Sequence, residues 1–181
     1  MSGSFNFQPV LRGENISIRP IVETDFDDLY DCASDKEVWS GHPAKYRYKK
    51  EEFNKWFKGA IDSKIAIVFV DNCSNKAIGS SRFYTTPLAK NDISIGYTFL
   101  ARDFWGGKTN YEIKKLMLDY AFHNFNCVWF HIAPSNVRSQ KATQKIGAVF
   151  SHEELADFSG TLESWLFYKL EKSKWLVKAA N

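Results

Sequence analysis

The chain has 181 residues, of which 44% are hydrophobic and 16% aromatic, so it can bury a substantial core and is not expected to be disordered. Its 24 basic and 21 acidic side chains leave a net charge of +3, which is too balanced to argue for a nucleic-acid partner. The longest apolar run, residues 65–70, is far too short for a membrane span. With no signal peptide in residues 1–7, we expect a single cytoplasmic domain over residues 1–181.

The first third of the chain predicts one strand and two helices. Residues 16–19 alternate between apolar and polar and predict a strand that Pro20 stops. Thr24 is expected to cap a helix, with Asp27 three residues on as in a capping box. A second amphipathic helix is predicted by apolar residues at helical spacing: Phe53, Trp56, Phe57, Ala60 and Ile61.

The middle of the chain predicts a run of strands. Residues 65–70 predict a strand buried on both faces, and 77–84 its hairpin partner across the turn formers at 71–76. Pro87 breaks this strand, and residues 93–100 predict the next one.

A glycine turn, with Gly106 and Gly107 bare of side chains, then precedes an amphipathic helix. Backbone N–H groups at the positive end of a helix suit a phosphate or pyrophosphate. We expect Lys114, Lys115 and Asp119 to lie away from the apolar face of this helix, which is formed by Ile113, Leu116, Met117, Tyr120 and Ala121.

The last third predicts a strand at 128–133, a short helix that opens at Asn136 and ends at Gly147, and two strands at 149–152 and 162–170. The order of elements predicts an α/β fold with a mixed sheet and helices on both faces.

Five motifs in this order carry a family resemblance: Ile16-Ser17-Ile18-Arg19-Pro20 with Asp25, Ile95-Gly96-Tyr97, Trp105-Gly106-Gly107, Leu116-Met117-Leu118-Asp119-Tyr120-Ala121-Phe122, and Asn136-x-x-Ser139 followed by Lys145-Ile146-Gly147-Ala148. Together they resemble the GNAT superfamily of acetyl-CoA-dependent N-acetyltransferases. Within it they resemble the branch of the ribosomal-protein N-terminal (Rim-type) acetyltransferases. The resemblance implies a mixed, mostly antiparallel central sheet flanked by helices on both faces, and acetyl-CoA as co-substrate.

The phosphate loop departs from the pattern of the superfamily, Arg/Gln-x-x-Gly-x-Gly/Ala. Lys108 stands where the central glycine is expected, and Asn110 where the final small residue is expected. A Trp-Gly-Gly-x-x-Asn loop occurs in a subgroup of the family. The departure leaves open a non-catalytic acyl-CoA-binding regulatory module on the same fold.

The resemblance also implies which residues bind the cofactor: Phe99, Leu100, Trp105, Gly106, Gly107, Lys108, Thr109, Asn110, Asn136 and Ser139. Ser139 is the candidate acid for the leaving thiolate, or only a helix N-cap. Lys108 either contacts a phosphate or is a solvated turn residue, and Trp105 either shields the loop or packs beneath it. The tyrosine that many members use as the acid is replaced by Thr143.

Acetyl transfer to an amine also needs a base, because an aliphatic ammonium has a pKa near ~10. Glu153, Glu154 and Asp157 follow the penultimate strand and are the candidates for catalysis, although each is more typical of a surface charge. His131 and His152 either titrate usefully or are structural. The resemblance implies direct attack without an acyl-enzyme, and Cys127 then reads as a core thiol.

The acceptor is expected to be a primary amine, on a protein N-terminus or a small molecule. Residues 37–58 should form part of the entrance to the acceptor site, and their aromatic side chains suit a ligand or a homodimer contact equally. No cysteine or histidine spacing indicates a metal. An unrelated nucleotide-binding protein is disfavoured because neither phosphate-loop nor dinucleotide motif is present.

Overall fold

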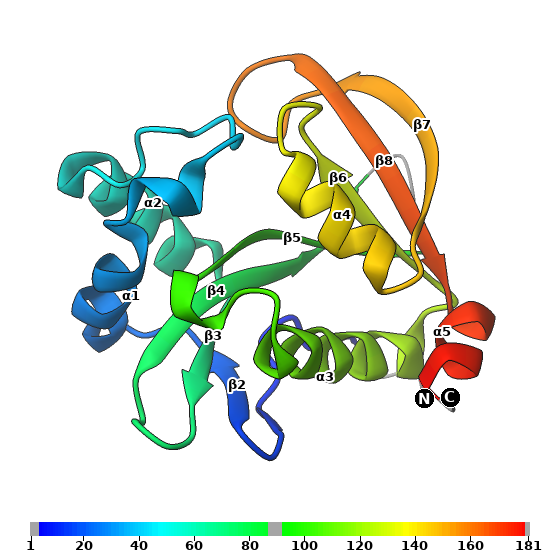
Figure 1. The fold of residues 1–181 in the computed structure, drawn as a ribbon, viewed down its shortest axis with the longest axis horizontal. Coiled ribbons are helices and arrows are strands. Elements are labelled where there is room, and N and C mark those ends of the chain that lie inside the picture. Colours follow the sequence, from blue (N-terminus) through cyan, green and yellow to red (C-terminus); the bar gives the residue numbers. More distant parts are fainter. Residues whose placement is uncertain (1–3, 87–91, 180–181) are drawn as a thin grey trace.

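A computed structural model describes residues 4–86 and 92–179, whose eight strands form one sheet (Figure 1). The strand order is β1-β2-β3-β4-β5-β6-β8-β7. All neighbours are antiparallel except β5 and β6, which are parallel. The strands are β1 (Leu11–Arg12), β2 (Ile16–Pro20), β3 (Ala66–Asp71), β4 (Ala77–Tyr84), β5 (Ile93–Leu100), β6 (Cys127–Ile132), β7 (Val149–Ala156) and β8 (Glu163–Glu171). The predicted mixed, mostly antiparallel sheet is thereby confirmed.

Helices cover both faces of the sheet, as expected. They are α1 (Phe26–Ala33), α2 (Lys50–Ser63), α3 (Lys108–Asn124), α4 (Val137–Lys145) and α5 (Lys172–Ala179), with short 3-10 turns η1 (Glu23–Asp25), η2 (Lys36–Trp39) and η3 (Arg102–Phe104). The sequence pattern missed β1, α5 and the three turns, which are too short or too terminal to show a period. Strand β7 is longer than its predicted stretch 149–152, because it pairs with β8 as far as Ala156. The predicted break at Pro87 lies outside the described residues.

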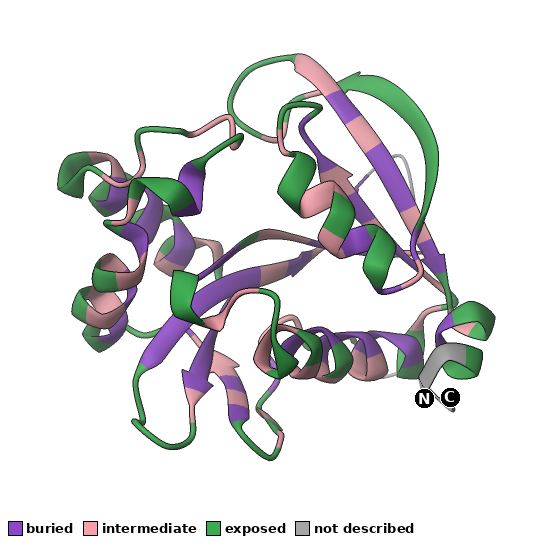
Figure 2. Ribbon diagram, in the orientation of Figure 1, coloured by how far each residue is buried: buried purple, intermediate pink, exposed green. Residues whose placement is uncertain are grey.

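Strand β3 separates two hydrophobic cores. Ile67 and Phe69 belong to the core that includes α3, whereas Ala66, Val68 and Val70 belong to the core under α1 and α2. These alternating side chains confirm a strand buried on both faces, as the buried central strands in Figure 2 show.

The strands β5 and β6 are paired at one end only. Their register consists of Ile93 with Val128 and Ser94 with Trp129. Beyond these pairs β5 continues to Leu100 and β6 to Ile132 without bonding to each other. The sheet is therefore parted between its two halves.

The start of α1 corrects the predicted cap. Residues Glu23–Asp25 form a 3-10 turn, and Thr24 lies inside it instead of capping the helix. The buried Asp25 carboxylate accepts two hydrogen bonds from Arg19, at 2.8 and 2.6 Å, and one from the Val22 N–H at 2.9 Å. This ion pair ties the end of β2 to the start of α1, and it overrides the local capping signal.

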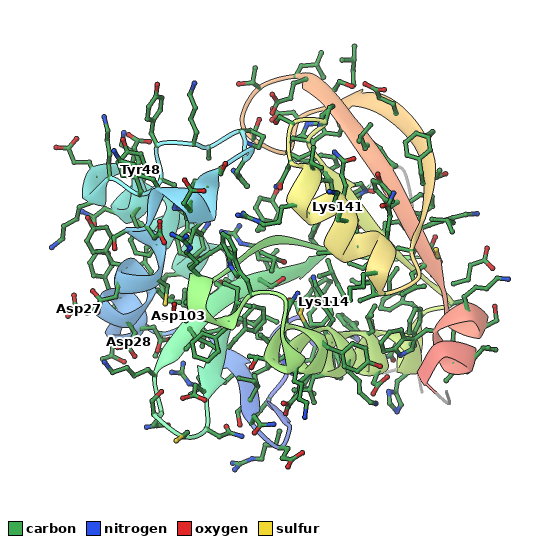
Figure 3. The ribbon with its side chains drawn as sticks, viewed as in Figure 1. Asp27, Asp28, Tyr48, Asp103, Lys114 and Lys141 are labelled. Atoms are coloured by element: carbon green, nitrogen blue, oxygen red, sulfur yellow. The ribbon has the colours of Figure 1, made fainter. Side chains whose placement is uncertain are left out.

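Replacing Asp25 by alanine is expected to lower the free energy of unfolding by about 3 kcal/mol, because the partly buried guanidinium of Arg19 and a backbone N–H lose their acceptor. Urea unfolding measures this loss. Asp27 is the matched control, since it points outward from α1 (Figure 3), and Asp27→Ala should change stability by less than about 0.5 kcal/mol. Equal losses of stability in Asp25→Ala and Asp27→Ala would contradict the structural role of the Asp25–Arg19 ion pair.

Candidate functional site

A cavity of about 560 Å³ occupies the gap between the parted strands, a volume within the usual range of ligand sites. Residues from the η2–α2 segment, β4, β5, the glycine turn, α3, β6 and α4 line it. Of the residues expected to bind a cofactor, it brings together Phe99, Leu100, Trp105, Gly106, Gly107, Asn110, Asn136 and Ser139. Lys108 and Thr109 are not among the lining residues.

The glycine turn presents the start of α3 to this cavity. Gly106 has φ +68, a conformation that strains other residues. Gly107 is the N-cap, and among the described residues no side-chain hydrogen bond caps the N–H groups at this start of the helix. These donors and the positive end of a 17-residue helix therefore face the cavity. Lys108, the first residue of α3, is exposed.

Trp105 packs against the cavity wall. Its indole N–H donates to the Leu100 carbonyl at 2.8 Å. The guanidinium of Arg138 lies 4.0 Å from the centroid of its ring, a cation–π contact. The ring thus connects the end of β5 to the first turn of α4.

Three side-chain hydrogen bonds join the two sides of the cavity, and we call this set the clasp. Arg138 donates to the carbonyls of Glu37 at 2.9 Å and Val38 at 2.7 Å. Ser135 donates to the Gly41 carbonyl at 2.8 Å. A Cβ added at Gly41 would lie 2.6 Å from the Ser135 carbonyl oxygen, so the glycine permits this approach.

The first turn of α4 shows that Ser139 is not the N-cap of this helix. Asn136 is the N-cap, and its side-chain oxygen accepts the Ser139 N–H at 3.2 Å. Within the part of the chain that the structure describes, no hydrogen bond from the Ser139 hydroxyl is found, and the residue lines the cavity. Thr143, in the usual position of the tyrosine, is buried and also lines it.

Three lysines line the same cavity: Lys114, Lys141 and Lys145. Lys114 was expected on the solvent side of its helix but is only 9% exposed, and Figure 3 places it between α3 and α4. Its ammonium lies 5.6 Å from the centroid of the Phe130 ring. Burial lowers the pKa of Lys114 to about 8. The parting of the strands explains this correction, because it leaves a cavity where a continuous sheet would require an apolar side chain.

Tyr84 and His131 form a hydrogen-bonded pair in the cavity wall, with 2.7 Å between the phenol oxygen and Nδ1. Burial lowers the pKa of His131 to about 4 and raises that of Tyr84 well above its ordinary value. The imidazole is therefore neutral near pH 7 and is available as a proton acceptor. Phe158 stacks on the imidazole with 4.4 Å between ring centroids.

The three candidate carboxylates lie outside this first cavity. Glu153, Glu154 and Asp157 are exposed, and none of them lines the cavity. Glu154 lies 3.4 Å from His152, and Asp157 accepts the Gly160 N–H at 2.7 Å.

A second cavity of about 520 Å³ adjoins the first and shares Tyr84, Tyr97 and Phe158 with it. Its other lining residues include Arg82, Glu154 and Asp157. The site thus has two adjoining compartments, and Tyr84 of the Tyr84–His131 pair lines both.

The thiols lie outside both compartments. Burial raises the pKa of Cys32 to about 12 and that of Cys127 to about 11. Cys73 is exposed in the turn between β3 and β4. None of the three lines either cavity.

A protein-family model and several solved structures that match this chain are all of acetyltransferases. The family model described as Acetyltransferase (GNAT) domain matches residues 15–149. A GCN5-related N-acetyltransferase from Brucella melitensis superposes with a TM-score of 0.81 at 17% identity, covering 93% of this chain and 81% of that one. RimJ from Mycobacterium smegmatis, in complex with CoA-disulfide, gives 0.66 at 16% identity over 96% and 94% of the two chains. Spermidine N-acetyltransferase from Vibrio cholerae, in complex with CoA and spermine, gives 0.64 at 16% identity over 91% and 99%.

No helix in residues 4–86 and 92–179 is long and apolar enough to cross a membrane.

A half-buried histidine in the cavity wall, His42, gives a prediction about the pH dependence of stability. The Nδ1 of His42 accepts the Ala44 N–H at 2.9 Å. Burial, and then the charges of Arg47 and Arg138, lower the pKa of His42 to about 3. Unfolded His42 takes up a proton below about pH 6.5, whereas folded His42 does not. Its contribution to stability is therefore present above pH 6.5 and is lost as the pH falls towards 3.

We expect His42→Asn to reduce the stability lost between pH 7.5 and 5.0 by roughly 1–2 kcal/mol. Asparagine keeps a side-chain oxygen that can accept the same N–H but does not titrate. Urea unfolding at the two pH values measures the difference, with the exposed His123→Asn as control. An unchanged pH dependence in His42→Asn would contradict the pKa shift.

Proposed function

The chain belongs to the GNAT acetyltransferase family, and from that premise we propose that it transfers acetyl from acetyl-CoA to a primary amine by direct attack at the parted strands. The family match identifies the protein as an N-acetyltransferase with acetyl-CoA as its acyl donor. The observation that carries the proposal is the cavity itself, in which the gap between β5 and β6 meets the uncapped start of α3.

The residues present fit a CoA molecule. The free N–H groups at Gly107 and the start of α3 suit its pyrophosphate. Lys114, Lys141 and Lys145 supply positive charge along the same cavity. The unpaired edges of β5 and β6 leave backbone donors and acceptors for an extended amide-containing arm. Phe99, Leu100 and Asn136 are proposed to hold that arm.

The Tyr84–His131 pair is proposed to carry out proton transfer during the reaction. With a pKa of about 4 the imidazole is too weak a base to keep the proton of the attacking ammonium, so the imidazole and the phenol of Tyr84 are proposed to pass this proton on to water. The phenol stays protonated at neutral pH because its pKa is raised. The hydroxyl of Ser139 is proposed to donate to the leaving thiolate. Glu153, Glu154 and Asp157 are less suited as the base, because they are exposed and lie outside the first cavity.

Direct attack is favoured by the position of the thiols. No cysteine lines either cavity, and burial keeps Cys32 and Cys127 protonated. Positioning the amine beside the thioester then accounts for much of the rate. The cytoplasmic location and the homodimer stay predictions.

Gly107→Asp is expected to abolish stabilisation by acetyl-CoA. An aspartate is a good N-cap, so the variant should be as stable as the wild type, but its carboxylate occupies the free N–H groups and repels a phosphate. Saturating acetyl-CoA should raise the Tm of the wild type by roughly 5–10 °C. It should raise the Tm of the control Gly107→Ala by a similar amount. If acetyl-CoA raises the Tm of Gly107→Asp as much as that of the wild type, the start of α3 does not bind acetyl-CoA.

Tyr84→Phe and His131→Gln are expected to lower kcat by about 10²-fold or more, with little change in the Tm shift given by acetyl-CoA. Thiol release from acetyl-CoA in the presence of an amine panel measures the rate. His152→Gln is the control, because that histidine lies on β7, which β8 separates from β6, and it does not line the cavity. Full activity of both variants would exclude the pair from proton transfer.

A further inference from the structure

Two arginines in the site have no counter-ion. Arg47 lines the first cavity and Arg82 the second. Among the residues that the structure describes, neither guanidinium forms an ion pair, and the Nε of Arg82 is buried without any hydrogen-bond partner. The sequence of the undescribed segment 87–91 contains no acidic residue. Burying a cation without a partner is costly, so the pair needs an explanation.

Aromatic rings hold both guanidinium groups in place. Arg47 lies 5.0 Å from the centroid of the Trp39 ring and 6.0 Å from that of Trp56. Arg82 lies 4.7 Å from the centroid of the Tyr97 ring. Stacking on rings positions a guanidinium while leaving its N–H fork free. These contacts orient the two cations without neutralising them.

The two cations also act on each other. Burial, and then the charge of Arg82, lower the pKa of Arg47 to about 10. Burial also lowers the pKa of Arg82. Tyr97 and Glu52 raise the pKa of Arg47 but only partly offset these two effects. Arg47 lines the first compartment and Arg82 the second, and Tyr97 lines both. An anion bound between the two cations would relieve both penalties.

Arg82 lines only the second compartment, which contains none of the residues proposed for CoA, whereas Arg47 lines only the first. Tyr97, on which Arg82 stacks, lines both compartments together with Tyr84. The glycine turn and the three lysines proposed for CoA line only the first compartment. The second compartment, of about 520 Å³, also has Glu154 and Asp157 among its lining residues, and these suit a cationic amine. A ligand with charges of both signs would match this arrangement.

We propose that the acceptor is a small amine that carries a carboxylate, of the amino-acid class, and that Arg47 and Arg82 bind this carboxylate. Paired N–H donors of a guanidinium match the two oxygens of a carboxylate. The proposal rests on the acetyl transfer proposed above, and it names the class of the substrate. Polyamines lack the anionic group and would meet two uncompensated cations.

The test compares amines that differ only in the carboxylate: lysine with cadaverine, ornithine with putrescine, and phenylalanine with phenethylamine. We expect kcat/KM to be roughly 10–100-fold higher for at least one amino acid than for its decarboxylated partner, as for a hydrogen bond to a charged group. Equal values within every pair, or a preference for the polyamines, would overturn the proposal. So would a protein that binds acetyl-CoA but acetylates no carboxylate-bearing amine.

Arg47→Gln and Arg82→Gln should each raise KM for the preferred amino acid and narrow its advantage over the decarboxylated amine, with the Tm shift by acetyl-CoA retained. The exposed Arg12→Gln on β1 is the matched control and should keep the full preference. Loss of the acetyl-CoA shift in the wild type would refute acetyl transfer itself, which separates the two failures.

A second readout needs no substrate. Removing either buried cation should leave the ligand-free protein as stable as the wild type or more stable, because a desolvated like-charge pair is relieved. A large loss of Tm in both Arg47→Gln and Arg82→Gln would show that the guanidinium groups are structural and would overturn the proposal.

Discussion

The site depends on the short parallel pairing between β5 and β6. Two residue pairs join the strands at one end, and from there each strand carries an unpaired edge into the protein. Unpaired strand edges normally attract another chain. Here the helices and the η2 segment enclose them, so the edges line a cavity instead of forming a surface. The short turn η3 and then the glycine turn follow β5, and this places the start of α3 at the open end of the gap.

The electrostatics follow from the same gap. It admits cations where a continuous sheet would bury apolar side chains. Lys114 lies on the side of the glycine turn, whereas Arg82 and Arg47 lie about Tyr97. Between them the wall is nearly neutral, with a phenol and an uncharged imidazole. A thioester and an amine can thus meet in a neutral zone between two positively charged ones.

Sequence periodicity predicted the elements that have a local cause. The alternation in residues 65–70 and the helical spacing of Phe53, Trp56 and Ala60 both arise from burial on a defined face, and the structure confirms both. The start of α1 was predicted wrongly, because the Asp25 carboxylate is held by Arg19 from another element. Lys114 was misplaced because a lysine in an amphipathic pattern normally indicates solvent.

The candidate site was only partly visible in the sequence for a related reason. The glycine turn is contiguous, so Gly106 and Gly107 stand out by themselves. Tyr84 and His131 are 47 residues apart, and their pairing arises from the sheet order. Arg47 and Arg82 come from a loop and a strand and read as ordinary surface charges. Their burial becomes apparent only when the aromatic rings around them are placed.

The gap between β5 and β6 is closed at both ends. Strand pairing closes one end, and the clasp closes the other with three side-chain hydrogen bonds to the carbonyls of Glu37, Val38 and Gly41. The two ends are closed by different kinds of bond, because β5 and β6 are joined by backbone pairing within the sheet, whereas the clasp consists of side chains that donate to loop carbonyls. Loss of the clasp would therefore leave the strand pairing of the sheet in place.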